Sequence, residues 1–575
     1  MTTHGRPAGR PPRRTLATRG RLLVAVLALG LLGAAGRPPS AAGQVEPPTV
    51  VAPAGGANPI VQENLRAGGA QWQRVSPAPP RTGVDHPEGN SPDGGANEVE
   101  QWEPPVINGY ADRVSVAAGD TIHFYVSTTA PAYDLSINRM GWYGGTGGHE
   151  VHSAFGQIGA PQPIPTPDPE TGLIAANWLP SYTLVIPYDW VSGVYLVRLL
   201  ATNEARDVGY ILFVVRDDNQ AADFVYKLPV NTYQAYNNWG GKSLFRYNST
   251  GGPATKVSFD RPYSQWDGAG QFFDWDFPMI RWLEREGYNL TYITDVDAHA
   301  GTGWLAGRRA LLSVGHDQYW SKEMRDNWEA ARDVGRSLGF FGGNTAYWQV
   351  RYEASPRGAN RVLVSYRDAR LDPLTGVDNS RVTVAFDSDV VRRPANALLG
   401  VEWAGSTGFG NTFPYVVQAA DHWIFAGTGA APGQAWSAVV GGEYDHVVQN
   451  ATTPPGLVTL SASPVTDLQG QPAMANSAYY RQGGMVFTAG TVDWAWGLDA
   501  WRQAGLVDER IQRATANVLE AFRQGRPPQA EPAPGGGAAV PWLVGAGLLL
   551  LVAVAATGLW YWRRRPIPPP EDPWA

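Results

Sequence analysis

The residues best placed to do chemistry lie in two loops, each of which follows a short apolar segment. The first loop is residues 315–320 (GHDQYW), and the second is residues 342–345 (GGNT). A histidine can move a proton, and amide side chains can hold a substrate or a developing oxyanion. We therefore predict that His316, Asp317, Gln318 and Asn344 share one site. The alternative for His316 is a side chain that only hydrogen-bonds the loop backbone.

The segments around these loops explain why residues so far apart in sequence should meet. Residues 310–314 and 338–341 are short apolar runs typical of buried strands, and residues 321–334 have a helical period with Ser321 as a plausible N-cap. A strand, helix, strand unit of this kind forms a parallel crossover, which brings both loops to one edge of a sheet. Ligands of open α/β sheets bind at that edge.

The same alternation of strands and helices begins at Ala222 and indicates a doubly wound α/β domain over residues 217–525, with additional β segments after Gly358. The segment 231–241 (NTYQAYNNWGG) follows its first strand and should open onto the same sheet edge, where Tyr236 can supply a phenol. The alternative is an aromatic-rich loop that is packed under its neighbours.

Residues 106–216 have a different pattern, with short alternating or apolar segments separated by turn signals. Short strands without a helical period indicate an immunoglobulin-like β-sandwich. The glycine cluster at 144–148 is not followed by Lys-Ser/Thr or by a helix, so it predicts a hairpin turn and not a phosphate loop.

The N-terminal region has the pattern of a secretory signal. An arginine-rich stretch without acids precedes the apolar run 22–35, and residues 1–42 are therefore predicted to be a signal peptide. Residues 43–105 are rich in proline and glycine and indicate a linker, with one short ordered patch at 58–61 (NPIV).

The C-terminal region predicts a membrane anchor. A linker at 526–541 leads to residues 542–562, which are uncharged and long enough to span a bilayer, and the tail 563–575 begins with three arginines. The alternative is a buried core helix, which the flanking proline-rich segments disfavour. We expect a single-pass cell-membrane protein with an extracellular N-terminal part and a short cytoplasmic tail.

Composition and missing motifs exclude several functions. The formal charge of the 575-residue chain is −7, which argues against nucleic acid as a partner. Cysteine is absent, so no disulfides stabilise the chain, and no standard zinc motif or Gly-x-Ser-x-Gly elbow occurs. The acidic pairs Asp274/Asp276 and Asp295/Asp297 raise a glycosidase as an alternative, but acids beside predicted helix starts and strand ends usually serve as caps or turn formers.

Six segments of the chain carry a family resemblance by their composition and order. They are SGVYLVRL (192–199), TYQAYNNWGGKSLF (232–245), PMIRWLEREGYNLTY (278–292), LLSVGHDQYWS (311–321), FFGGNTAYWQVRYE (340–353) and VVGGEYDHV (439–447). In this order they resemble the large subunit of bacterial N,N-dimethylformamidase and the secreted proteins that share its C-terminal region. The resemblance covers roughly residues 106–525 and implies a β-sandwich followed by a domain of the class I glutamine-amidotransferase type.

The resemblance also implies an iron centre held by two tyrosines and one glutamate. The two tyrosines correspond to Tyr195 and Tyr236, and the glutamate position of the family loop Gly-His-Asp-Glu-Tyr-Trp-Ser is Gln318 in this chain. Hard anionic oxygen ligands suit Fe(III), which would activate water or polarise an amide. A neutral glutamine at the ligand position removes one negative charge.

By the same resemblance, His316, Asn344 and Glu443 match polar residues that line the site, where a general base and an oxyanion donor are needed. Two hypotheses follow from these residues. The first is a metal-dependent hydrolase that cleaves C–N bonds of small amides. The second is an extracellular binding protein for a cell-envelope sugar or peptide, which retains the amidase fold without its activity.

Overall fold

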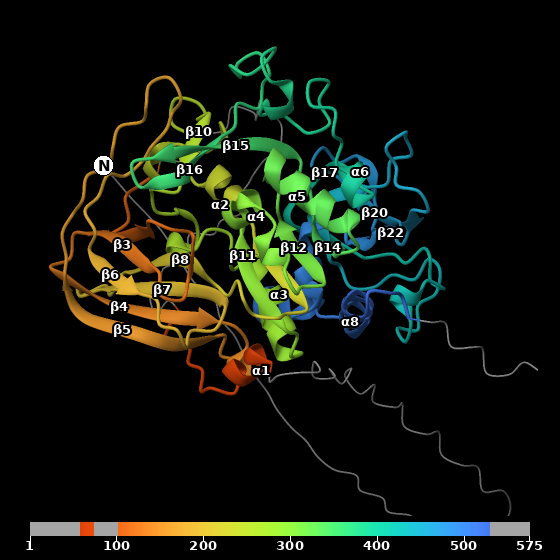
Figure 1. Ribbon diagram of the computed structural model, residues 1–575, viewed down its shortest axis with the longest axis horizontal. Coiled ribbons are helices and arrows are strands. Elements are labelled where there is room, and N and C mark those ends of the chain that lie inside the picture. The colour runs from red at the N-terminus through yellow and green to blue at the C-terminus, as the bar shows by residue number, and fades with distance from the viewer. Residues whose placement is uncertain (1–57, 74–101, 529–575) are drawn as a thin grey trace, which may run out of the picture. The chain divides into compact units, whose positions relative to one another are not determined.

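The computed structural model describes residues 58–73 and 102–528 (Figure 1). Within these residues the chain is β-rich, with six sheets and about 21% helix. The fold is built from three parts: a pair of sheets in the N-terminal third, a central seven-stranded sheet, and three small sheets that border the central sheet.

Two sheets form the N-terminal third. Their facing sides share one apolar core, to which Phe124, Ile137 and Phe213 contribute. Alternate residues of the larger sheet, such as Leu196 and Leu212, point away from this core and pack against the rest of the chain, so this sheet is buried on both faces. The three-stranded sheet contains β1 (Ile107–Ala111), β3 (Thr121–Thr128) and β6 (Tyr182–Val185), and the five-stranded sheet contains β2 (Ser115–Ala117), β8 (Val208–Arg216), β7 (Gly193–Ala201), β4 (Ala132–Met140) and β5 (Gly148–Ile158).

The central sheet carries the predicted site. Its strand order is β11 (Leu290–Thr294), β9 (Phe224–Leu228), β12 (Ala310–His316), β14 (Ser337–Gly343), β23 (Gly484–Thr488), β22 (Ala478–Gln482) and β19 (Val458–Thr459). The first five strands are parallel, β22 pairs antiparallel with β23, and β19 pairs antiparallel with β22. The register pairs Gly315 with Gly342 and His316 with Gly343, so the predicted loops leave the sheet side by side.

Short helices cover both faces of the central sheet. α3 (Asp276–Arg285) and α8 (Glu509–Gln524) pack on one face through residues such as Ile280 and Leu519, and α4 (Asp295–Ala300) and α5 (Lys322–Asp333) pack on the other through residues such as Ala298 and Trp328. The predicted N-cap is confirmed, because the Ser321 hydroxyl accepts a hydrogen bond from the Met324 backbone at the start of α5. The remaining α-helices are α1 (Pro59–Asn64), α2 (Val230–Tyr236), α6 (Asn396–Leu399) and α7 (Ala500–Gln503).

Three small sheets border the site. One contains β10 (Lys256–Ser258), β16 (Gly358–Val364), β15 (Trp348–Ser355) and β13 (Tyr319–Ser321), the second pairs β17 (Glu402–Phe413) with β18 (Val440–His446), and the third pairs β20 (Ser463–Thr466) with β21 (Pro472–Ala475).

The predicted fold class is wrong as a description of this chain. We expected a β-sandwich followed by a doubly wound α/β domain of the class I glutamine-amidotransferase type, whereas the described residues form a multi-sheet, β-rich fold. After residue 346 the chain forms mainly antiparallel pairs, such as β15 with β16 and β17 with β18, and not further strand–helix–strand units. Short strands joined by local turns close on their neighbours without the long crossover that a parallel sheet needs.

The prediction of a single-pass cell-membrane protein is also corrected. Across residues 58–73 and 102–528, no helix is long and apolar enough to cross a membrane. The longest of them, α8, has 16 residues and buries only the face that packs on the central sheet. The predicted signal peptide 1–42, the segment 542–562 and the tail 563–575 lie outside the described residues.

The ordered patch predicted at 58–61 is confirmed and is the start of α1. The Asn58 side chain accepts a hydrogen bond from the Ile60 backbone, and Pro59 occupies the first turn, where its missing N–H costs nothing. Farther along the segment, Trp72 stacks on Phe273 at 5.7 Å between ring centroids. The segment is therefore docked on the residues that precede α3.

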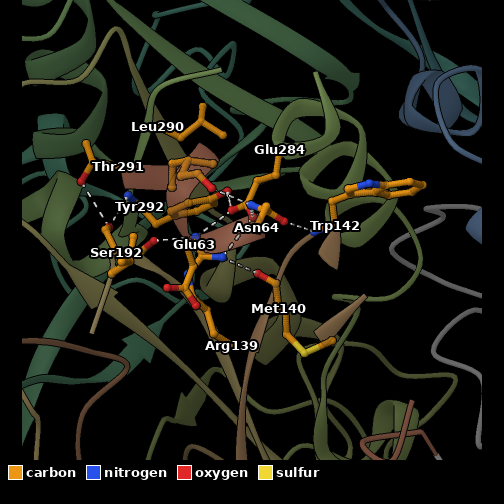
Figure 2. Close-up of polar contacts among 12 residues, drawn as sticks. Glu63, Asn64, Arg139, Met140, Trp142, Ser192, Glu284, Leu290, Thr291 and Tyr292 are labelled. Carbon is orange, nitrogen blue, oxygen red and sulfur yellow. Dashed lines mark hydrogen bonds and ion pairs between the residues drawn. The ribbon is translucent and has the colours of Figure 1, made fainter. Parts of the chain in front are cut away.

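A buried polar cluster joins α1, the β-sandwich and α3 (Figure 2). Arg139 of β4 donates two hydrogen bonds to Glu284 of α3, at 3.0 and 2.8 Å, and both side chains are fully buried. The Glu284 carboxylate also accepts hydrogen bonds from the Tyr292 hydroxyl at 2.7 Å and from the Asn64 amide at 2.8 Å. All three elements are thus tied to one carboxylate.

We expect Arg139→Met to lower the free energy of unfolding by about 3–5 kcal/mol, because it leaves the charge of Glu284 buried without its cation. Adding Glu284→Gln should recover most of this loss by removing that charge. Arg370→Met is the matched control, since the Arg370 side chain is 87% exposed in its ion pair with Asp368. Denaturant unfolding measures all four proteins, and a loss below about 1 kcal/mol for Arg139→Met would contradict the assignment.

Candidate functional site

The two predicted loops lie against each other at the carboxyl edge of β12 and β14. The Ala346 backbone N–H donates to the Asp317 carbonyl and the Tyr347 N–H donates to the Gln318 carbonyl, both at 3.0 Å. A Cβ atom at Gly342 would lie 2.2 Å from the Gly315 carbonyl oxygen, so only glycine permits this approach. The close spacing of the strands therefore brings His316 and Asn344 together.

Glu443 of β18 is the carboxylate that these loops share. Its Oε2 atom lies 3.2 Å from His316 Nε2 and accepts a hydrogen bond from Asn344 Nδ2 at 2.7 Å. The His316 contact has the distance of an ion pair but not the geometry of a hydrogen bond. All three residues are buried.

Tyr236 and Gln318 form the second half of the cluster. The Tyr236 hydroxyl donates to Gln318 Oε1 at 2.9 Å, and its ring lies 5.0 Å from the imidazole of His316. Burial raises the pKa of Tyr236 well above its usual value, and the charge of Glu443 adds to that effect. The phenol is therefore neutral and acts as a hydrogen-bond donor.

Tyr236 is the last residue of α2, a short helix in the segment for which a packed aromatic-rich loop was the alternative. The residues of α2 have modest helix propensity, but every one of them is buried, so tertiary packing decides its conformation. The helix is anchored at its start by the Asn231 side chain, whose Nδ2 donates to the Tyr319 carbonyl at 3.0 Å. This anchor joins α2 to the loop that carries Gln318.

Several polar atoms of the cluster have no hydrogen-bond partner among the described residues. They include Gln318 Nε2, Asn344 Oδ1 and His316 Nδ1. Buried polar atoms are nearly always paired, so three unpaired atoms within one cluster indicate a place for a polar ligand. One is a donor, one is an acceptor, and the imidazole nitrogen can be either.

Aromatic rings enclose His316. Trp275 and Phe409 lie 5.7 and 5.8 Å from it between ring centroids. Phe409 is only half-buried and belongs to a bulge of β17 between Gly408 and Gly410, which have φ angles of 82° and 90°. This bulge places the Phe409 ring beside His316.

A buried ion cluster fixes the first loop on the side that faces the central sheet. Lys227 of β9 donates to Asp317 at 2.8 Å and also pairs with Asp295, while Ser313 donates to Asp317 at 2.6 Å. Burial by itself would lower the pKa of Lys227, but the charges of Asp295 and Asp317 outweigh it and raise that pKa. Asp317 therefore faces the sheet and leaves Gln318 to face Tyr236.

The structure does not bring Tyr195 to this cluster. Tyr195 lies in the core between the two sandwich sheets, where its ring stacks on Trp190 at 4.8 Å and its hydroxyl donates to the Val191 carbonyl at 2.7 Å. Burial raises the pKa of this phenol as well. Of the predicted site residues, the structure gathers His316, Asn344, Glu443, Tyr236 and Gln318.

The donor set does not fit the iron centre that the resemblance implies. Around Gln318 the structure offers one neutral phenol and one neutral amide, while Glu443 faces His316 and Asn344. Across the part of the chain that the structure describes, no group of three His, Cys, Asp or Glu side chains has a metal-binding arrangement. Fe(III) favours anionic oxygen ligands, so we assign no reaction step to iron.

Sequence reasoning missed three residues that contact the cluster: Asp445, Trp275 and Phe409. Asp445 accepts a hydrogen bond from the Asn344 backbone at 2.8 Å, and burial raises its pKa to about 7. Asp445 could have been found from the sequence, because it lies two residues after Glu443 on one strand and alternate residues of a strand share a face. Trp275 and Phe409 carried no comparable signal.

Of the acidic residues that were assigned to caps or turns, Asp297 confirms the prediction, because it accepts a hydrogen bond from the Thr294 backbone N–H at 2.8 Å in a capping box at the start of α4. Asp274, Asp276 and Asp295 are buried, and Asp276 does not cap its helix. Asp276 begins α3, and it accepts hydrogen bonds from the hydroxyls of Tyr226 and Tyr233 at 2.8 and 2.5 Å. Burial raises its pKa to about 7. Asp274 accepts from the Trp266 indole at 3.0 Å.

One comparison with known proteins identifies the family of this chain. Residues 134–508 match the family described as N,N-dimethylformamidase beta subunit-like, C-terminal. The chain belongs to this family. The match includes the five clustered residues and extends over most of the β-sandwich.

No curated protein matches the chain. Among solved structures, one match is a cycloisomaltooligosaccharide glucanotransferase from Paenibacillus sp., with 14% identity and a TM-score of 0.13. That match covers 32% of this chain and 27% of the other, so the chain spans about a quarter of its length.

Asp493 holds Trp275, one of the rings beside His316, and its burial leads to a prediction about pH. Its carboxylate accepts a hydrogen bond from the indole N–H of Trp275 at 2.8 Å, and burial, with the nearby charge of Asp274, raises its pKa from 3.8 to about 7. The folded state thus holds this proton more tightly than the unfolded state. The stability that Asp493 contributes is present at low pH and is lost as the pH rises to about 7.

We compare the free energy of unfolding of Asp493→Asn with that of the unmodified protein at pH 5 and at pH 8. The difference should shift in favour of Asp493→Asn by roughly 2 kcal/mol at the higher pH, because the amide cannot ionise. Asp508→Asn is the control, because the pKa of Asp508 is shifted in the opposite direction. Hydrogen bonds from Arg510 outweigh burial and lower that pKa, so the stability lost in Asp508→Asn should be similar at pH 5 and pH 8. Melting temperatures at the two pH values measure this, and an equal shift for Asp493→Asn at both would rule the assignment out.

Proposed function

We propose that this protein hydrolyses the C–N bond of small carboxamides, with His316 as the general base. The observation that carries the proposal is the contact of His316 with Glu443 inside a buried cluster that also contains unpaired amide atoms. Membership in the dimethylformamidase-like family supports the same reaction class. The fold by itself does not establish activity, so the proposal rests on the site.

Glu443 orients the base. A carboxylate 3.2 Å from Nε2 favours the imidazole tautomer with its proton on that nitrogen, which leaves the lone pair on Nδ1. Asn344 holds the carboxylate through its Nδ2 donor at 2.7 Å. His316 Nδ1 then takes a proton from water as the water oxygen bonds to the amide carbon.

Gln318 stabilises the charge that develops on the substrate oxygen. Tyr236 occupies Gln318 Oε1, so the opposite end of the amide, Nε2, is the donor that faces a ligand. A donor held in place before the reaction stabilises a tetrahedral oxyanion without reorganisation. His316 returns the proton to the leaving nitrogen, and the products are a carboxylic acid and an amine.

A second candidate is a protein that binds an amide-bearing ligand, such as a cell-envelope sugar or peptide, without cleaving it. Gln318 favours this candidate, because the family loop has a glutamate there and the substitution removes a negative charge from the site. The two candidates share the contacts to the amide and differ in whether water attacks it. Turnover measurements therefore separate them.

We expect His316→Ala to lower kcat/KM for small amides by about 10²–10⁴-fold, because it removes the base, and Glu443→Gln to lower it by about 10–100-fold. His422→Ala is the control, since His422 packs against Trp423 and Tyr479 outside the cluster. Release of ammonia or amine from formamide, acetamide and N-methylformamide measures the rates. Binding without turnover in the unmodified protein favours the second candidate, and full activity in His316→Ala excludes the assigned base.

The two tyrosines that the resemblance paired should behave differently. Tyr236→Phe frees Gln318 and should lower kcat/KM by roughly tenfold, whereas Tyr195→Phe should leave activity unchanged and cost about 1 kcal/mol of stability through its lost hydrogen bond to Val191. We also expect neither stoichiometric iron nor a visible tyrosinate band in the purified protein. Iron bound at one equivalent and lost in Tyr195→Phe would overturn this reading of both tyrosines.

A further inference from the structure

We infer that a cavity between the β-sandwich and α2 binds one small monovalent anion, of about the size of chloride. Its lining includes the polar side chains of Arg261 and Gln234 and apolar side chains such as those of Leu228 and Phe259. None of the five clustered site residues lines this cavity, and the inference does not depend on amide hydrolysis. The observation that carries it is a fully buried guanidinium without a carboxylate partner.

The Arg261 side chain hydrogen-bonds only to neutral oxygen atoms in the described parts of the chain. Its Nη1 donates to the carbonyls of Trp239 and Lys242 at 3.1 and 2.8 Å, and its Nη2 donates to the Asn237 carbonyl at 2.8 Å. Its Nε donates to Gln234 Oε1 at 3.4 Å. A guanidinium has five N–H groups, so these four acceptors leave one N–H of Nη2 for a ligand. Arg261 is 1% exposed, so bulk water does not hydrate its charge.

The neighbouring carboxylate is already used by another arginine. Asp260 precedes Arg261 in sequence, but its side chain pairs with Arg361 at 2.7 Å and accepts a hydrogen bond from Ser355 at 2.5 Å. Burial outweighs the opposing effect of the Tyr263 phenol and lowers the pKa of Arg261 to about 9, so the guanidinium is still charged at neutral pH. Buried charges in proteins are normally paired, because an isolated one is costly to desolvate. An anion beside Arg261 would supply the missing negative charge.

The size of the cavity limits the ligand to one small ion. The volume open to the centre of a water-sized particle is about 20 Å³, and one water needs about 10–15 Å³ on this measure. A halide ion fits this space, whereas a phosphate or a fatty acid does not. Arg113 also lines the cavity, and its side chain is 53% exposed, so the cavity reaches the surface and an ion can enter. Water is the competing occupant, but it carries no charge to offset the buried cation.

Arg261 also connects the cavity to the end of α2. Its three carbonyl acceptors belong to the segment that directly follows Tyr236, the last residue of that helix. An anion that pairs with Arg261 stabilises the guanidinium in the position from which it holds this segment. Binding of the anion should therefore stabilise the folded protein.

Titration of the full-length protein with sodium chloride tests the inference. Sodium gluconate keeps the ionic strength constant, because gluconate is too large for the cavity. We expect saturable broadening of the chloride nuclear magnetic resonance line. We also expect the melting temperature to rise by about 1–2 °C between about 1 and 100 mM chloride, since the ion binds the folded state.

Two substitutions at the cavity assign the binding to it. Arg261→Met removes the charge, and Val114→Leu keeps the charge but fills the cavity, which Val114 lines. Each should abolish the saturable broadening and the rise in melting temperature. Arg370→Met, at an exposed ion pair with Asp368, is the control and should keep both. Val114→Leu retains every hydrogen bond of Arg261, so it decides the question if Arg261→Met does not fold.

Two results would overturn the inference. Broadening that increases linearly with chloride and never saturates means that the cavity holds only water. Saturable binding that persists in Val114→Leu places the ion elsewhere on the protein. Chloride binding is measured without an amide, so neither result bears on the proposed hydrolysis, and the absence of amide turnover would not affect the anion site.

Discussion

The buried ion pair between Arg139 and Glu284 is the interaction on which the arrangement of this protein depends. It joins β4 of the sandwich to α3, and the same carboxylate holds Asn64 of α1. A buried pair of this kind contributes little net stability but is expensive to break, so its main effect is to specify position. Trp275, directly before α3, packs against His316, so the start of the same helix provides one wall of the site.

Close approach of parallel strands is the second constraint. Glycines at the facing positions of β12 and β14 let the loops meet, and β18 then adds Glu443 and Asp445 from a separate small sheet. The site is thus assembled where sheets of different kinds meet. Because it is buried, Tyr236 stays neutral and polar side chains depend on one another for their hydrogen bonds.

Gln318 is the position at which this chain departs from the family loop. A glutamine in place of the glutamate of the family loop turns an anionic oxygen into an amide with one acceptor and one donor end. Tyr236 takes the acceptor end, and the donor end, Nε2, has no hydrogen-bond partner among the described residues. The same substitution that weakens the case for a metal centre thus leaves a buried donor beside the His316 cluster.

Local patterns in the sequence were sufficient for the elements that carry the loops. The strands predicted at 310–314 and 338–341 are part of β12 and β14, and Ser321 caps α5 as expected, because apolar runs and N-caps depend on neighbours in sequence. The predicted fold class failed where strands after residue 346 paired antiparallel in small sheets, since strand pairing depends on partners distant in sequence.

The sequence by itself determined which polar residues follow the strands and that His316 and Asn344 meet at one sheet edge. Only the tertiary structure decided the rest of the site. It separated Tyr195, which faces the sandwich core, from Tyr236, and it added Trp275, Phe409 and Asp445 from other elements. The physical reason is that burial and the orientation of side chains arise from packing between distant segments, which residue spacing does not encode.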